Sequence, residues 1–140
     1  MKQNQKGFTL IELLAVIVIL AIIALIATPI ILNVVNDSRK KAAQDSAYGV
    51  VEAVKLAYSE AMTDNNAPTG PVTIDFSDSK DDWKIGTKKV NVSGTQPDSG
   101  AIQIDTEGNI SFAKDKNDAG FKISNYPCTM DSNSKITCGD

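Results

Sequence analysis

A single carboxylate, Glu12, stands at the head of a long apolar run, and its chemistry needs an explanation. The run from Leu13 to Leu32 holds 18 apolar residues out of 20, the exceptions being Thr28 and Pro29. An ionisable side chain at the centre of a membrane helix costs about 2.5–3.5 kcal/mol on insertion scales. Buried ions are tolerated when they are paired. Something in the sequence should therefore compensate for Glu12 or use it.

The two cysteines are the next residues that could react. Cys128 and Cys138 lie close together near the C-terminus, and their spacing does not fit C-x-x-C chemistry. In an exported domain this spacing predicts a disulfide that closes a short loop, with free thiols or metal ligands as the alternatives. A loop of ~15 residues closed in this way would contribute about 3 kcal/mol in the chain-entropy model.

Composition argues against most catalytic sites. The 140 residues include no histidine, which removes the Ser-His-Asp and Cys-His arrangements and most zinc sites. A net charge of −3 offers no basic footprint for nucleic acid. The basic cluster of Arg39, Lys40 and Lys41 follows the apolar run and predicts a solvated helix face near a membrane surface, with DNA contact as a minor alternative. We therefore expect no catalytic residue, no metal, no cofactor and no nucleic-acid partner, and we expect a protein that is not an enzyme.

Two acidic stretches contain the carboxylates that a calcium site would need. The first holds Asp75, Asp78, Asp81 and Asp82, and a solvated acidic loop is the preferred interpretation. The second, from Asp115 to Gly120, begins like a calcium loop. Tyr126 stands where such a loop would place its closing glutamate. Neither stretch predicts a metal.

The N-terminal residues carry a specific motif, Gly7-Phe8-Thr9-Leu10-Ile11-Glu12-Leu13. Over about residues 1–35 the sequence resembles the type IV pilin family, which includes the pseudopilins of secretion and DNA-uptake systems. The resemblance implies that residues 1–7 are a leader, that a prepilin peptidase cuts between Gly7 and Phe8, and that it methylates the new amine of Phe8. Glu12 would then accept that amine, from its own chain or from a neighbouring subunit during assembly.

Two plainer interpretations compete for the same segment. An ordinary secretory signal peptide would use the small residues Ala24–Ala27 for cleavage, but the apolar run is long for such a signal. A simple transmembrane anchor explains the length. Neither explains why a glycine, an aromatic residue and a carboxylate occupy fixed places ahead of the run.

A helix over residues 8–62 must position this motif. Residues 8–35 are apolar on all sides and are expected to form a transmembrane segment or a filament core. Residues 36–62 are amphipathic, with small apolar residues recurring at spacings of three and four: Ala43, Ala47, Val50, Val54, Ala57 and Ala61. Pro29 removes a backbone hydrogen bond and clashes with the carbonyl of Leu25, so a kink is expected there.

A β-rich head is predicted for residues 63–140. Prolines and glycine in Thr63–Val72 end the helix. Short alternating runs then predict strands, with a hairpin turn at Thr106–Gly108. These runs are residues 72–76, 88–92, 101–105, 109–112, 121–124 and 135–138. We expect an antiparallel sheet of four or five strands on the amphipathic helix half, with Phe76, Trp83, Phe112 and Phe121 in the core. The fold class is α+β, the lollipop shape of pilins, and the disulfide loop closes the head.

The resemblance implies a structural subunit of a type IV pilus that polymerises with itself through its N-terminal helix. Its other implied partners are the prepilin peptidase, the pilus assembly machinery and the cytoplasmic membrane. The head would lie outside that membrane before assembly, and the assembled filament would lie on the cell surface. The alternatives are a pseudopilin of a type II secretion or competence system, and a single-pass anchored binding domain that does not polymerise. A secreted, calcium-dependent enzyme is a more distant rival.

Overall fold

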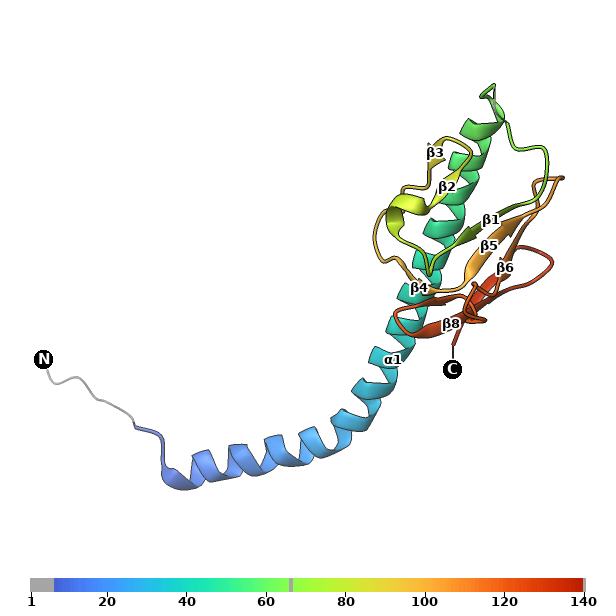
Figure 1. Ribbon diagram of the computed structural model, residues 1–140. Helices are drawn as coiled ribbons and strands as arrows, with labels where there is room; N and C mark the ends of the chain where they lie inside the picture. Colours follow the sequence, from blue (N-terminus) through green and yellow to red (C-terminus); the bar gives the residue numbers. More distant parts are fainter. Residues whose placement is uncertain (1–6, 66, 140) are drawn as a thin grey trace, which may run out of the picture. The chain divides into compact units, whose positions relative to one another are not determined.

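The computed structural model describes residues 7–65 and 67–139, so the predicted leader lies outside the described residues except for Gly7. The chain divides into two units, Met1–Ser38 and Arg39–Asp140. One helix, α1 (Leu10–Met62, 53 residues), contributes to both units, and the strands all belong to the second (Figure 1). The fold class is therefore α+β, with a long N-terminal helix followed by a small antiparallel β head, as predicted.

In the first unit, α1 exposes its apolar side chains on every side. The large apolar residues from Leu10 to Val35 are all exposed, with Leu25 at 80% and Ile17 at 62%. By length and composition α1 could cross a membrane, and none of its membrane-length apolar window is buried. Apolar surface of this extent is unfavourable in water at about 25 cal/mol per Å². This half of the helix needs lipid or protein around it.

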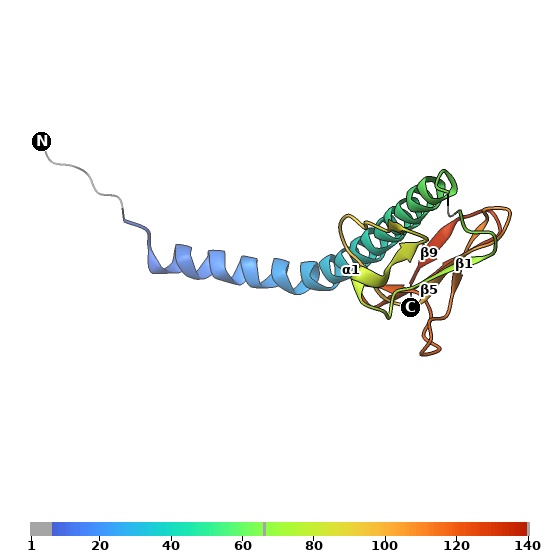
Figure 2. The same ribbon diagram turned by 45° about the horizontal axis from the view of Figure 1, so that its top comes forward.

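In the second unit, α1 is amphipathic as its spacing predicts. The residues that recur at intervals of three and four are buried, together with Val51. Glu52, Lys55 and Leu56 lie on the exposed side. In both views the green part of α1 runs alongside the strands (Figures 1 and 2). The buried stripe forms the helix side of the core of the head.

Helix α1 ends where its sequence predicts. The N–H groups of Thr63 and Asp64 bond to the carbonyls of Glu60 and Ala61, three residues back. Such bonds tighten the last turn of a helix. Pro68 and Pro71 follow soon after and cannot continue it.

Nine short strands and one turn of 3-10 helix make up the described part of the head. In chain order they are β1 (Val72–Asp75), η1 (Lys80–Asp82), β2 (Lys84–Ile85), β3 (Lys88–Lys89), β4 (Pro97–Ser99), β5 (Ala101–Ile104), β6 (Ile110–Ala113), β7 (Lys122–Ile123), β8 (Tyr126–Met130) and β9 (Ile136–Cys138). All pairings are antiparallel. The strands form three sheets, with orders β1-β5-β6, β2-β3 and β4-β7-β8-β9, rather than the one sheet expected.

A tight crossing at Gly100 accompanies this division. Gly100 has a φ of +92°, and a Cβ added there would lie 2.3 Å from the Cα of Phe121. The strands on either side of Gly100, β4 and β5, belong to different sheets. Only glycine combines this φ with so close a backbone approach. The chain therefore passes from one sheet to another at a point where no side chain fits.

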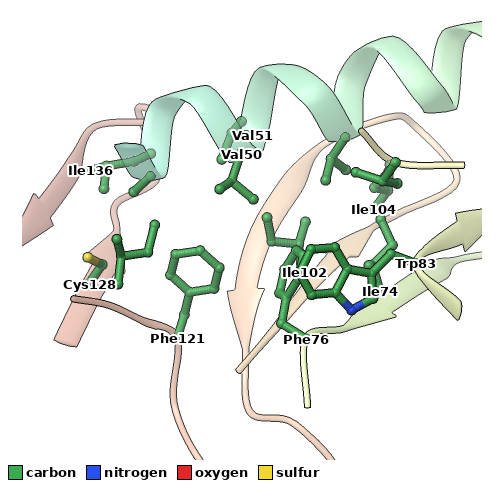
Figure 3. Packing of buried hydrophobic residues seen from close by; sticks show 14 of the residues in the cluster. Val50, Val51, Ile74, Phe76, Trp83, Ile102, Ile104, Phe121, Cys128 and Ile136 are labelled. Carbon is green, nitrogen blue, oxygen red and sulfur yellow. The ribbon is translucent and has the colours of Figure 1, made fainter. Parts of the chain in front are cut away.

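The core lies between α1 and the strands (Figure 3). Val50 and Val51 point from the helix toward residues of the strands and their loops. Phe76 makes edge-to-face contacts with Trp83 at 5.0 Å and with Phe121 at 5.7 Å between ring centroids, and Phe112 stacks on Phe121 at 4.1 Å. All four predicted core aromatics therefore pack together, although Phe112 is only partly buried.

The disulfide between Cys128 and Cys138 is present, as predicted, and it joins directly opposite residues of β8 and β9. The connecting loop is one of three turns with the same design, headed by Asp105, Asp115 and Asp131. In each, aspartate Oδ1 accepts hydrogen bonds from the N–H groups two and four residues later, and the aspartate N–H bonds to the carbonyl four residues later. The residue three after the aspartate has a positive φ: Gly108, Asp118 and Ser134.

Candidate functional site

The start of α1 holds Glu12 by a reciprocal pair of hydrogen bonds with Thr9. The main-chain N–H of Thr9 donates to Glu12 Oε2 at 2.8 Å, and the main-chain N–H of Glu12 donates to Thr9 Oγ1 at 3.3 Å. This is a capping box, which satisfies two N–H groups that the first turn of a helix leaves without partners. It also places an anion where the helix dipole favours one.

Thr9 was not singled out from the sequence, although a signal for it was there. Thr9-Leu10-Ile11-Glu12 fits the S/T-x-x-E pattern that heads many helices. The motif therefore combines two features: the glycine and aromatic residue of the junction, and the cap that orients Glu12.

The capping box leaves part of the Glu12 carboxylate available. Oε2 is occupied by the Thr9 N–H, and within residues 7–65 and 67–139 no ion pair involves Glu12. The bond from Thr9 uses Oε2, and Oε1 accepts no hydrogen bond within the described chain. An ammonium group from outside could bind there without breaking the cap.

The junction between Gly7 and Phe8 is accessible. Phe8 is 86% exposed, and apart from the adjacent residues no atom of the described chain lies within 4 Å of the position that a Gly7 Cβ would take. Gly7, Phe8 and Thr9 precede the first residue of α1. An enzyme that binds extended backbone could therefore reach this peptide bond without unwinding the helix.

Pro29 lies inside α1, which is assigned as helix without a break from Leu10 to Met62. Proline has no N–H to donate to the carbonyl of Leu25, so the helix lacks one internal bond at this point. The preceding turn carries a second deviation, since Thr28 Oγ1 donates to the carbonyl of Ala24 at 2.6 Å. Side-chain bonds of this kind often bend helices. The kink at Pro29 stays a prediction.

The calcium-like stretch that begins at Asp115 is one of the three aspartate turns. Asp115 is buried, and its carboxylate accepts hydrogen bonds from the N–H groups of Gly100, Asn117 and Ala119. The bond from Gly100, followed by those from the turn, holds the pKa of Asp115 below its usual value. Across the described ranges, no three His, Cys, Asp or Glu side chains gather as a metal site would require. The residues whose spacing resembles a calcium loop thus form a hydrogen-bonded turn.

Comparison with known proteins bears on the N-terminal segment. Residues 2–28 match the family model described as "Prokaryotic N-terminal methylation motif". The chain is also 47% identical over 60 residues to a protein of Eikenella corrodens described as "Fimbrial protein EcpC". That similarity covers 43% of this chain and 39% of the relative, so the chain spans well under half the length of the curated protein it matches. No solved structure shows a significant match.

Proposed function

We propose that this chain is a member of the type IV pilin and pseudopilin family and that it is a structural subunit of a type IV pilus. The observation that carries the proposal is the combination of the methylation motif with a helix whose apolar half is exposed on every side. A subunit of this kind is stored in a membrane and then polymerises through its N-terminal helix.

Maturation is proposed to begin at the junction of Gly7 and Phe8. A prepilin peptidase would cut this bond, release residues 1–7 and methylate the amine of Phe8. The accessible junction supports this step, because no other part of the described chain covers it. Cleavage replaces a neutral peptide group with a cationic amine at the head of α1.

Glu12 is proposed to pair with the Phe8 amine of a neighbouring subunit. An unpaired carboxylate in an apolar bundle is costly, and removing one partner of a buried ion pair typically costs about 3–5 kcal/mol. The Thr9 cap keeps the carboxylate at the start of the helix and leaves Oε1 available. A subunit placed in the wrong axial register would leave a charge without a partner, so the pair would fix the register of assembly.

Pro29 is proposed as the point at which the helix yields when it packs in a filament. The bond missing at Leu25 lowers the cost of local extension there. The remaining helix turns on either side keep their bonds.

Before assembly the proposed subunit resides in the cytoplasmic membrane with its head outside, where the disulfide is stable. The assembly machinery then transfers it to a surface filament. Within the same family, a pseudopilin of a type II secretion or competence system is the second candidate, since the same motif heads those proteins. A single-pass anchored domain that does not polymerise is the candidate from another class.

Intact mass and N-terminal sequencing of protein from the cell envelope and from sheared surface material test the proposal. A chain that starts at a methylated Phe8 and is abundant in sheared fibres supports the pilus subunit. The same mature chain confined to the envelope at native expression favours the pseudopilin. A chain that starts at Met1, or after Ala27, contradicts both and leaves the anchored or secreted domain.

A further inference from the structure

Two segments of the head carry the Asn-X-Ser pattern at which oligosaccharides are attached to asparagine. They are Asn91-Val92-Ser93 and Asn109-Ile110-Ser111. A transferase that acts on the folded head must take the asparagine carboxamide and the serine hydroxyl into its active site. The surroundings of the two asparagines therefore decide which of the two patterns can serve as an acceptor.

Asn109 is held inside a hairpin by its carboxamide and by its main chain. Its Nδ2 donates to Asp105 Oδ2 at 2.8 Å, and its main-chain N–H donates to Asp105 Oδ1 at 2.8 Å. Its carbonyl accepts the N–H of Asp105 at 3.0 Å. Ser111, the third residue of this pattern, lies in β6 opposite Gln103 of β5. The Asn109 pattern can thus reach an active site only if the β5–β6 hairpin opens.

Asn91 is exposed and has none of these restraints. It lies between β3 and β4, and its carboxamide makes no hydrogen bond within the described chain. The hydroxyl of the exposed Ser93 is equally without a partner among the described residues. The main chain of residues 91–95 forms no hydrogen bond with the rest of the described chain. This segment can therefore enter an active site without the loss of any hydrogen bond of the head.

Two hollows flank Asn91. One has a volume of about 190 Å³ and is lined by Trp83, Val92 and Gln96. The other has a volume of about 50 Å³, lies between α1 and this segment, and is lined by Leu56 and Glu60. The side chain of Leu56 is 61% exposed. Asn91 thus has open space on both sides and an uncovered apolar side chain beside it.

We propose that Asn91 is an acceptor of an N-linked oligosaccharide and that Asn109 is not. This inference rests on the part of the proposed function that places the head outside the cytoplasmic membrane. The co-reactant is an oligosaccharide linked to a lipid through pyrophosphate. Asn91 Nδ2 bonds to the anomeric carbon of the first sugar, and the bond from that carbon to the pyrophosphate oxygen breaks. The lipid pyrophosphate leaves with the electron pair, and the amide proton passes to a base of the transferase.

The first sugar of this oligosaccharide lies over Leu56. The C–H groups of a sugar ring form an apolar face, and its contact with Leu56 removes apolar surface of both from water. The carboxylate of Glu60 lines the same hollow and accepts a hydrogen bond from a sugar hydroxyl. The remaining sugars extend from the surface of the head into solvent.

Mass spectrometry of the full chain from its native host tests the assignment. Cleavage before aspartate separates the two patterns into residues 82–97 and 105–114. We expect a glycan on the first peptide, located on Asn91 by fragmentation, and an unmodified second peptide. A first peptide of unmodified mass overturns the proposal. A glycan located on Ser93, Thr95 or Asn109 overturns it as well.

Two serine variants form a matched pair. Ser93→Ala removes the hydroxyl that the first pattern requires and leaves Asn91 in place, and Ser111→Ala does the same for the second pattern. Both serines are exposed and neither hydroxyl makes a hydrogen bond in the described chain, so both variants should keep the thermal midpoint of wild type. We expect complete loss of the glycan from Ser93→Ala, and wild-type occupancy in Ser111→Ala and in Ser93→Thr. A glycan that remains in Ser93→Ala contradicts the proposal, as does its loss from Ser93→Thr.

The same spectra separate this inference from the proposed function. A chain that starts at a methylated Phe8 and carries no glycan overturns the acceptor and leaves the pilus subunit intact. A glycan on Asn91 of a chain that starts at Met1 supports the acceptor and contradicts the pilus subunit. A chain that starts at Met1 and carries no glycan overturns both.

Discussion

The main-chain N–H of Gly100 donates a hydrogen bond to Asp115 Oδ2 at 3.0 Å, and this bond ties the turn after β6 to the start of β5. The other carboxylate oxygen, Oδ1, holds the turn itself together through Asn117 and Ala119. One buried carboxylate thus joins a local turn to a distant strand. Its protonation should loosen both at once.

The pH dependence of stability should carry the signature of Asp115. Hydrogen bonds, first from Gly100, lower the pKa of Asp115 in the folded chain. A carboxyl group with a lowered folded pKa stabilises the protein above its unfolded pKa of about 3.9, and that contribution is lost as the pH falls through the folded pKa. Asp115→Asn should be less stable than wild type at pH 7, and the two should converge below pH ~4. Urea unfolding at a series of pH values measures the free energy of unfolding of both proteins. A difference between the two that stays constant with pH would exclude the role of Asp115.

Gly100→Ala should destabilise the head severely. The new Cβ would meet the backbone of Phe121 at 2.3 Å, and the φ of +92° is unfavourable for any residue with a side chain. Strain of this kind costs on the order of 1–3 kcal/mol before the steric clash is added. Gly94 is the control, because its φ is +91° but no atom lies within 4 Å of its added Cβ. The midpoint of thermal unfolding should therefore be highest for wild type, lower for Gly94→Ala and lowest for Gly100→Ala.

Removal of the disulfide should destabilise the C-terminal hairpin. Cys128 and Cys138 are 10 residues apart, and the loss of so short a closed loop costs about 2–4 kcal/mol in typical proteins. The double variant Cys128→Ala/Cys138→Ala should unfold at lower urea than wild type, and a reducing agent should shift wild type toward the variant. A reducing agent that shifts both proteins equally would point to an effect other than the disulfide.

Glycine should stabilise the turn headed by Asp131. Ser134 has a φ of 61° and makes no side-chain hydrogen bond in the described chain. The left-handed conformation costs an L-residue roughly 1–2 kcal/mol. Glycine avoids this cost, but it loses more backbone entropy on folding, so only part of the cost is recovered. Ser134→Gly should therefore gain up to about 1 kcal/mol, and Gly108→Ser, at the equivalent place in the Asp105 turn, should lose a similar amount. The midpoints of urea unfolding of the two variants, compared with that of wild type, measure these two changes in stability.

Glu12→Gln should separate membrane residence from assembly. The amide can still accept the Thr9 N–H, so the cap survives, but the charge that would pair with a Phe8 amine is gone. We expect the variant to reach the envelope at wild-type levels and to lose at least about tenfold in sheared filament. Thr9→Val is the companion variant, since it removes the other half of the cap and keeps the charge. Wild-type filament yield from Glu12→Gln would exclude a role for that charge in assembly.

The parts of the structure that follow from periodicity were predictable. The helix to Met62, the buried stripe from Ala43 to Ala61 and the hairpin around Gly108 all follow from residue spacing. Strand β4 was missed because Pro97-Asp98-Ser99 shows no apolar alternation, and its place in a sheet depends on tertiary contact with β7. Strand β8 was missed for a related reason, because Pro127 lies inside it and proline predicts the end of a strand.

The division into three sheets could not be predicted from local pattern. It accompanies the approach of Gly100 to Phe121, a contact between residues 21 positions apart in the numbering. The candidate site was more accessible to sequence reasoning, since the residues from Gly7 to Glu12 are contiguous. Thr9 was not predicted as a capping residue, although it forms the S/T-x-x-E pattern with Glu12.

The three aspartate turns have a consequence for how the head can change. Each turn satisfies its own main-chain groups through the aspartate and the residue with positive φ. In the Asp105 and Asp131 turns the exposed tip residues Thr106 and Ser132 take no part in these bonds. In the Asp115 turn, by contrast, the N–H of Lys116 bonds to Asp75 and its ammonium pairs with Asp78, which ties the tip to the segment around β1. A sequence can therefore diversify at the first two tips, or accept short insertions there, while the frame beneath stays folded. The head is in this sense a scaffold with two interchangeable tips and one that is fixed.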